Sequence, residues 1–196
     1  FSAYLLLKPG RIPYLNRNLY YFAGKDVWKT LFDLEAMRPG MVLLSAQAPD
    51  GDPAWCDVVT LMTPVATRPW EAWEGSVPGR RPEAYTALKA AMTQATVDFA
   101  CARLPELRDA IAHTYAATPL TYRHYTGAPH GAAYGLLKDW RSIMASHIPA
   151  RTKFENLLLT GQNLTVHGAI GVTLSAAATC SEIVGTEYLA KKIANA

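Results

Sequence analysis

The segment Thr160-Gly-Gln-Asn-Leu-Thr-Val-His-Gly-Ala-Ile-Gly171 contains three glycines, and a run of small residues follows it. No charged residue occurs from position 156 to position 181. The pattern predicts a short strand at 156–159, then a loop, then a helical pattern from Gly168 to Ile193. The Asn, Gln, Thr and His side chains make the segment too polar for lipid. We therefore interpret it as a strand, a loop and a helix buried against a larger body.

A glycine-rich loop that leads into a helix can serve as a ligand site. Glycine lets the backbone approach a ligand closely. The first turn of a helix offers unpaired N–H groups and a positive dipole end, which favour an anion or a developing negative charge. The other interpretation is a tightly packed helix whose small residues serve only close contact. One glycine-rich loop does not decide between the two.

The first half of the chain is typical of strands separated by turns. Short apolar runs occur at 3–7, 19–23, 41–47 and 58–63, and each ends near a Gly or a Pro. Alternating residues at 110–116 predict a further strand.

Helices are predicted between and after these strands. Apolar residues recur at spacings of three and four along 82–103, which predicts a long helix. Asp26 is a candidate cap for a short helix, and Thr118-Pro119 begins another that ends at Gly127. Together these elements predict an α+β fold, in which a mixed, mostly antiparallel sheet is flanked by helices.

Composition excludes several classes of protein. The chain has 196 residues, of which 50% are hydrophobic and 18% charged, so it is globular and not disordered. Its net charge is only +3, and no stretch is strongly basic, which argues against a nucleic-acid partner. Cys56, Cys101 and Cys180 stand far apart without CxxC spacing, so neither a disulfide framework nor a zinc site is expected. A reducing, cytoplasmic compartment is the simpler interpretation.

Other residue types give no convincing active site. His113, His124, His130 and His147 lack metal-ligand spacing, so no metal is expected. No GxSxG elbow places a serine nucleophile, so we do not expect a hydrolase. The Trp70-Glu-Ala-Trp-Glu74 stretch lies in a Pro-rich connector and is predicted as an exposed helical turn.

Several strings resemble one protein family. They closely resemble the C-terminal part of FAD-dependent oxidoreductases of the phytoene desaturase, carotenoid isomerase and retinol saturase subfamily, and the resemblance runs through nearly the whole chain. The most specific string is 160–171. The others are Ser45-Ala-Gln-Ala-Pro49, Met62-Thr-Pro64, Thr118-Pro-Leu-Thr-Tyr-Arg-His-Tyr-Thr-Gly127, Gly131-Ala-Ala-Tyr-Gly135 and Cys180-Ser-Glu-Ile-Val-Gly185.

The resemblance implies a division into two parts. Residues 1–150 would belong to the substrate-binding domain, and 151–196 would form the strand, loop and helix that complete the FAD-binding domain. The family's GxGxxG turn, which holds the FAD pyrophosphate, is absent from the chain. Since the chain also begins at Phe1 and not at Met, we expect a C-terminal fragment whose main partner is the N-terminal FAD-binding half of the same protein. The fragment alone is expected to be inactive.

The resemblance also implies site residues. Those expected to bind FAD are Gly161, Gln162, His167, Gly168, Gly171 and Val172. The amides near Gly171 and Val172 would stabilise the reduced flavin. Tyr134 would line the path of an apolar polyene or lipid substrate. A structural role for His167 or Tyr134 is an equal alternative, and no catalytic residue is assigned.

Two other functions stay open. One is a non-catalytic module that binds a lipid or an isoprenoid, and the other is an interaction domain whose apolar surface meets a partner chain. Peripheral membrane contact and self-association of the fragment are compatible with each of these functions.

Overall fold

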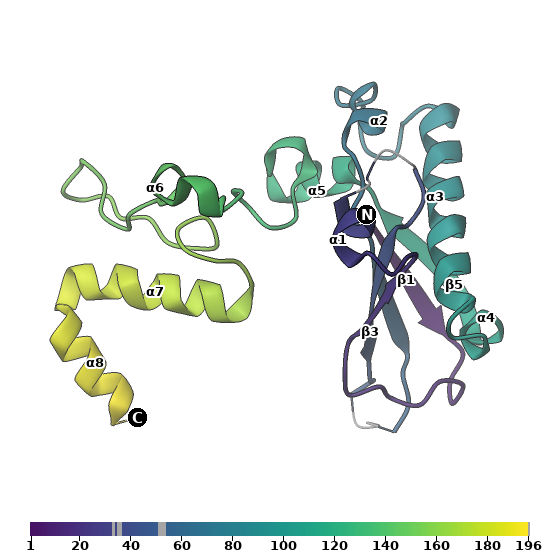
Figure 1. Cartoon of the computed structure of the whole chain (residues 1–196), viewed down its shortest axis with the longest axis horizontal. Helices are drawn as coiled ribbons and strands as arrows, with labels where there is room; N and C mark the ends of the chain where they lie inside the picture. Colours follow the sequence, from purple (N-terminus) through teal and green to yellow (C-terminus); the bar gives the residue numbers. More distant parts are fainter. Residues whose placement is uncertain (33, 35–36, 51–53, 196) are drawn as a thin grey trace. The chain divides into compact units, whose positions relative to one another are not determined.

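The computed structural model describes residues 1–32, 34, 37–50 and 54–195. The chain forms two compact units, Phe1–Gly131 and Ala132–Ala196, here called the sheet unit and the C-terminal unit (Figure 1). The functional boundary expected at residue 150 falls inside the C-terminal unit and stays a prediction.

The sheet unit is built on five antiparallel strands. These are β1 (Ser2–Leu7), β2 (Leu19–Phe22), β3 (Met41–Gln47), β4 (Val58–Met62) and β5 (Ile111–Ala117). Their order in the sheet is β2-β3-β4-β1-β5, and every neighbouring pair is antiparallel. The strand predictions are confirmed to within about one residue at each end, and the α+β class is confirmed with a sheet that is wholly antiparallel.

The long helix of this unit covers one face of the sheet. The sheet unit contains α1 (Val27–Phe32), α2 (Arg68–Glu71), α3 (Glu83–Cys101), α4 (Glu106–Ala110), α5 (Pro119–Thr126) and the 3₁₀ turn η1 (Pro129–Gly131). The long helix α3 runs beside the strands and contacts β1, β3 and β4 (Figure 1). The inner face of the sheet is the side toward α3, and its fully buried residues on the three central strands are Ala3, Leu5, Val42, Leu44, Val59 and Leu61, whereas Ala46 at the end of β3 is partly buried.

Local signals fix where the short helices begin and end. The Asp26 carboxylate accepts a hydrogen bond from the Lys29 amide at 3.0 Å, as expected of a cap for α1. Thr118 and Thr121 form a capping box at the start of α5. Gly127 ends α5 with φ 67°, a left-handed conformation that suits glycine.

The turn at 70–74 is exposed at Glu71, Ala72 and Glu74 as predicted, but Trp70 differs from the prediction. Trp70 is fully buried, stacked on Phe1 with ring centroids 6.2 Å apart and edge-on to Tyr85 at 5.8 Å. On the exposed side of the turn, Glu74 pairs with Arg123 at 2.6 Å. Trp70 therefore belongs to the core, because one helical turn can bury its indole while its carboxylates stay in water.

The C-terminal unit is helical and contains no strand among its described residues. Its elements are η2 (Trp140–Ser142), α6 (Ile143–Ser146), α7 (Gly168–Val184) and α8 (Thr186–Ala194). The strand predicted at 156–159 is replaced by an isolated bridge between Arg151 and Leu158, because this unit offers no second strand to pair with. The predicted helix to Ile193 is interrupted at Gly185, where φ is 87° and ψ is 140°.

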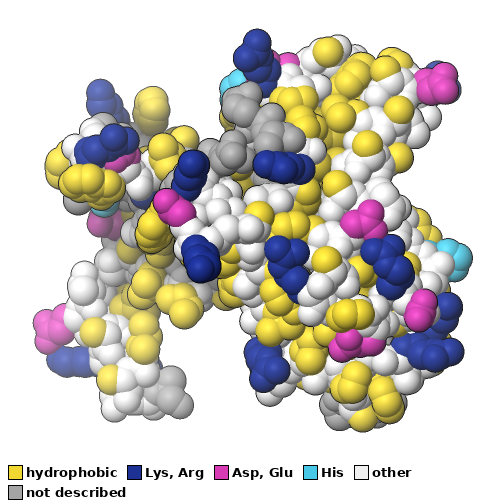
Figure 2. All heavy atoms as spheres, turned by 45° about the vertical axis from the view of Figure 1, so that its right-hand side comes forward, with side chains coloured by type: hydrophobic (Ala, Val, Ile, Leu, Met, Phe, Trp, Pro, Cys, Tyr) yellow, Lys and Arg dark blue, Asp and Glu magenta, His cyan; other side chains and the backbone are white. Residues whose placement is uncertain are grey.

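Apolar side chains of the C-terminal unit are largely exposed. Leu164 is its one buried large hydrophobic residue among those described. Hydrophobic side chains are visible on the surface of this part of the chain in Figure 2. No helix among the described residues is both long and apolar enough to span a bilayer.

Candidate functional site

The start of α7 presents backbone amides that no side chain caps. His167 is the N-cap residue, and its side chain makes no capping hydrogen bond. Because α7 begins at Gly168, the amides ahead of the first helical hydrogen bond are those of Gly168, Ala169 and Ile170. The amides of Gly171 and Val172, expected to be the free donors, lie inside the helical ladder. The donor position therefore moves about one turn toward the N-terminus.

The three glycines of the loop have different roles. A Cβ on Gly171 would lie 2.0 Å from the carbonyl oxygen of Val166, so Gly171 lets the loop pack on its own helix. Gly161 and Gly168 have φ values of 106° and 81°, and a Cβ on either would meet nothing within 4 Å. The backbone beside these two glycines is therefore open to a ligand.

Hydroxyl groups of α7 fasten the loop. The buried Ser175 hydroxyl accepts a hydrogen bond from the Gly161 amide at 2.7 Å. One turn later, the Thr179 hydroxyl donates to the Leu159 carbonyl at 2.7 Å. Leu164, within the loop, is buried. Neither hydroxyl was predicted, and the only signal is their spacing of four residues in a helix otherwise rich in alanine.

A second motif joins the loop from a distance in sequence. The amide of Leu136 donates to the Asn163 side-chain oxygen at 3.0 Å. Gly135 has φ 72°, and a Cβ there would lie 2.2 Å from that same oxygen, so both the left-handed backbone and the close approach favour glycine. The Lys138 ammonium donates to the carbonyls of Asn163 at 2.6 Å and Leu164 at 3.2 Å. The string ending at Gly135 is thus held against the 160–171 loop, and Lys138 is a residue that the sequence patterns do not reveal.

Tyr134 and His167 lie together at the surface of this assembly. Their ring centroids are 4.5 Å apart with an interplanar angle of 35°. Tyr134 is 52% exposed, and His167 is exposed too, at the N-cap of α7. Gln162 is partly buried beside Gly135, and Val172 is on the exposed side of α7. All six predicted cofactor residues and Tyr134 therefore belong to one unit.

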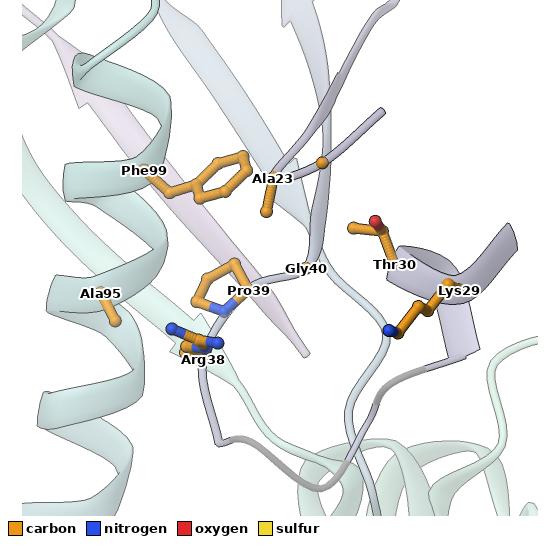
Figure 3. Close-up of a pocket in the computed structure, with 9 residues that line it drawn as sticks. Ala23, Lys29, Thr30, Arg38, Pro39, Gly40, Ala95 and Phe99 are labelled. Atoms are coloured by element: carbon orange, nitrogen blue, oxygen red, sulfur yellow. The ribbon is translucent and has the colours of Figure 1, made fainter. Parts of the chain in front are cut away.

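Cavities occur away from the loop glycines. One of about 320 Å³ in the C-terminal unit is lined by Lys138, His147, Leu164 and Val166, among others. Another, of about 550 Å³, lies in the sheet unit (Figure 3). There Phe99 and Ala95 project from α3, and Lys29 and Thr30 come from α1. None of the predicted site residues lines this second cavity.

The remaining chemistry of the described residues is limited. Burial raises the pKa of the Cys56 and Cys101 thiols, which disfavours the reactive thiolate. No group of three or more His, Cys, Asp or Glu residues in the described ranges is arranged to hold a metal ion. Arg141, by hydrogen bonding to Asp139, holds the pKa of that carboxyl below its ordinary range, but the two form a local ion pair.

Comparisons with known proteins point to the family suggested by the motifs. The chain is 30% identical to human all-trans-retinol 13,14-reductase over 143 residues, which are 68% of this chain and 23% of the human protein. The rat all-trans-retinol 13,14-reductase is 31% identical over 143 residues, which are again 68% of this chain and 23% of the rat protein. The chain belongs to the retinol saturase family of oxidoreductases. No protein-family model matches it.

Membership of the retinol saturase family does not by itself assign an activity. The chain spans about a quarter of the length of the curated relatives it matches. One further relative, from Danio rerio, is named an inactive all-trans-retinol 13,14-reductase, with 30% identity over 52% of this chain and 17% of that protein. The function of this retinol saturase relative must therefore be argued from its own residues.

Proposed function

We propose that this chain is part of an FAD-dependent oxidoreductase that acts on an apolar polyene, and that the 160–171 loop and the start of α7 hold the flavin end of FAD. The observation that carries the proposal is the uncapped start of α7 beside the open backbone at Gly161 and Gly168. The reductase names of the relatives favour reduction of a double bond over its formation.

The residues present suit the flavin ring and not the whole of FAD. Open backbone at two glycines lets a flat ring approach, and the exposed rings of Tyr134 and His167 add an aromatic wall. The chain has no GxGxxG turn for the pyrophosphate. We therefore assign the pyrophosphate site to the part of the protein that corresponds to the rest of the relatives' length.

In this assignment each residue of the site has a definite task. When bound, FAD supplies hydride transfer at its ring. The amides of Gly168, Ala169 and Ile170 would stabilise negative charge that accumulates beside them, as helix N-termini do. Ser175, Thr179 and Lys138 keep the loop in place through the hydrogen bonds described above. Tyr134 would contact the substrate.

A test uses the full-length protein and its flavin absorbance. Gly171→Val should abolish flavin retention, because the added carbon atoms would collide with the Val166 carbonyl and displace the loop. Gly75→Ala is the matched control, since a Cβ there meets nothing within 4 Å. Circular dichroism should show that both variants keep their helices.

The outcomes separate the proposal from its rival. A Gly171→Val protein that keeps both its yellow colour and its midpoint potential would contradict the role of the loop. A wild-type protein that is colourless but retains a lipid would favour the non-catalytic binding module.

A further inference from the structure

The sheet of the sheet unit has a second face that is apolar and only partly covered. The strand register defines this outer face as the side opposite the inner face. It consists of Ser2, Tyr4, Leu6, Tyr20, Phe22, Met41, Leu43, Ser45, Gln47, Val58, Thr60, Met62, His113, Tyr115 and Ala117. Its central members Tyr4, Leu43, Thr60 and Met62 are partly exposed, whereas their neighbours on the inner face are not.

Two strings that resemble the family meet on this outer face. In the β3–β4 pairing, Leu43 faces Met62 and Ser45 faces Thr60. Ser45 and Gln47 come from the first string and Met62 from the second. The site proposed at α7 uses neither string, so these residues call for a separate explanation.

A pair of hydroxyl groups lies at the centre of the outer face. Ser45 and Thr60 are direct cross-strand partners, so their Cβ atoms lie about 4.5–5.5 Å apart. Neither hydroxyl has a hydrogen-bond partner among the described residues. Tyr4, Leu43 and Met62 adjoin the pair. Partly covered hydroxyls without a partner among apolar neighbours suit a ligand that brings one polar group.

We propose that the outer face binds the apolar substrate, with its hydrocarbon part on Tyr4, Leu43 and Met62 and its alcohol group on the Ser45–Thr60 pair. This proposal takes the class of substrate from the proposed function and rests on it in that respect. The five strands make the face roughly 19 Å wide, at about 4.8 Å per strand spacing, which gives room for an elongated molecule.

The charge pattern favours a polyene alcohol over a protein partner. The outer face carries no Asp, Glu, Lys or Arg at all, which matches an uncharged ligand. A protein interface typically distributes its hydrogen bonds across its area and is rimmed by polar groups. Here the unpartnered hydroxyls Ser45 and Thr60 sit in the middle, as expected of a pocket wall that orients a mostly apolar molecule through one polar contact.

Equilibrium binding to the full-length protein tests the proposal without turnover. The probes are all-trans-retinol and its hydrocarbon analogue without the hydroxyl group, titrated by fluorescence with no reductant present. Thr60→Val should weaken retinol binding about three- to tenfold and leave the hydrocarbon unaffected, because only a hydrogen bond is lost. Met62→Lys should weaken both probes more than about tenfold, because it places a charge on the apolar wall.

The matched control is Thr114→Val. Thr114 is also a strand threonine, but it pairs with Leu5 and therefore lies on the other side of the sheet. Its substitution should change neither affinity. Flavin content and the thermal unfolding midpoint, measured for every variant, show whether each one is folded and loaded.

Each result supports or overturns the assignment. Equal effects of Thr60→Val on both probes, or retinol affinity that survives Met62→Lys in a folded protein, would overturn it. A Met62→Lys protein that keeps both affinities but changes its oligomeric state would also overturn the assignment, because the outer face would then be a contact between copies of the chain. A wild type that lacks flavin yet shows the expected pattern of affinities would refute the redox proposal and leave the substrate surface standing.

Discussion

Trp70 shows how one residue can reverse the interpretation of a segment. Its stretch contains two glutamates and lies among prolines, so composition alone predicts an exposed turn. In the structure the indole is completely buried against Phe1 and Tyr85, while Glu74 on the same turn forms a surface ion pair. Large aromatic side chains dominate core energetics, so the turn contributes to stability despite its polar neighbours.

The burial of Trp70 predicts a large loss of stability on truncation. Trp70→Ala should lower the free energy of unfolding by about 3–5 kcal/mol, because the change leaves a cavity in the core. Trp28→Ala removes an indole that is 71% exposed and should change stability by less than about 0.5 kcal/mol. Urea unfolding followed by circular dichroism measures both. Similar losses for the two variants would show that the Trp70 contacts are not part of the folded core.

At the scale of elements, those with a local signal could be predicted. The helix α3 has an apolar stripe at spacings of three and four, and β3 is a short apolar run between turn residues. Both appear within one or two residues of their predicted bounds. The strand at 156–159 could not be predicted correctly from its own residues, because a strand exists only where a partner strand accepts its hydrogen bonds.

The candidate site shows the same limit. Its glycines are visible in the sequence, and the structure gives two of them the open backbone that a ligand needs. Lys138 and Ser175, which hold the loop, carry no local signal because the loop backbone groups that they bind lie at least 14 residues away in the sequence. The helix begins at Gly168 as predicted, but its free donors are the amides of its first three residues and not those of Gly171 and Val172.

Gly185 separates two helices that the sequence pattern joins. Its φ of 87° and ψ of 140° belong to a region that is essentially open only to glycine. The Arg151 guanidinium meets the Glu182 carboxylate at 2.7 Å just before the break and fixes the end of α7. The break is therefore a property of one residue and not of weak helical tendency in α8.

Gly185→Ala should be costly for that reason. We expect a loss of about 1–3 kcal/mol in the free energy of unfolding, or a rise in helix content if the two helices merge. Chemical denaturation and far-ultraviolet circular dichroism of the full-length protein distinguish these two responses. Gly75→Ala, where φ is not positive and a Cβ meets nothing within 4 Å, is the control. An unchanged stability and an unchanged spectrum would mean that the chain at Gly185 does not need this conformation.

At the scale of the whole molecule, the two units differ in how completely they bury their apolar residues. The sheet unit contains a continuous core that runs from Phe1 to Leu120. In the C-terminal unit, by contrast, Leu137 is 83% exposed and Trp140 is 82% exposed. Exposed apolar area of this kind marks a surface that other polypeptide or a ligand covers.

This difference predicts that the two units will behave differently when produced separately. A polypeptide of residues 1–131 should unfold cooperatively in urea, because its sheet and α3 already enclose a core. A polypeptide of residues 132–196 should show no cooperative transition and should bind a hydrophobic dye, because Leu164 is the one large apolar side chain that its described residues bury. Its helices α7 and α8 have too little packing to persist alone, since tertiary contacts supply most helical stability. A sharp unfolding transition of the 132–196 polypeptide, with no dye binding, would show instead that this unit folds by itself. The inference that other polypeptide or a ligand covers its apolar surface at α7 would then be wrong.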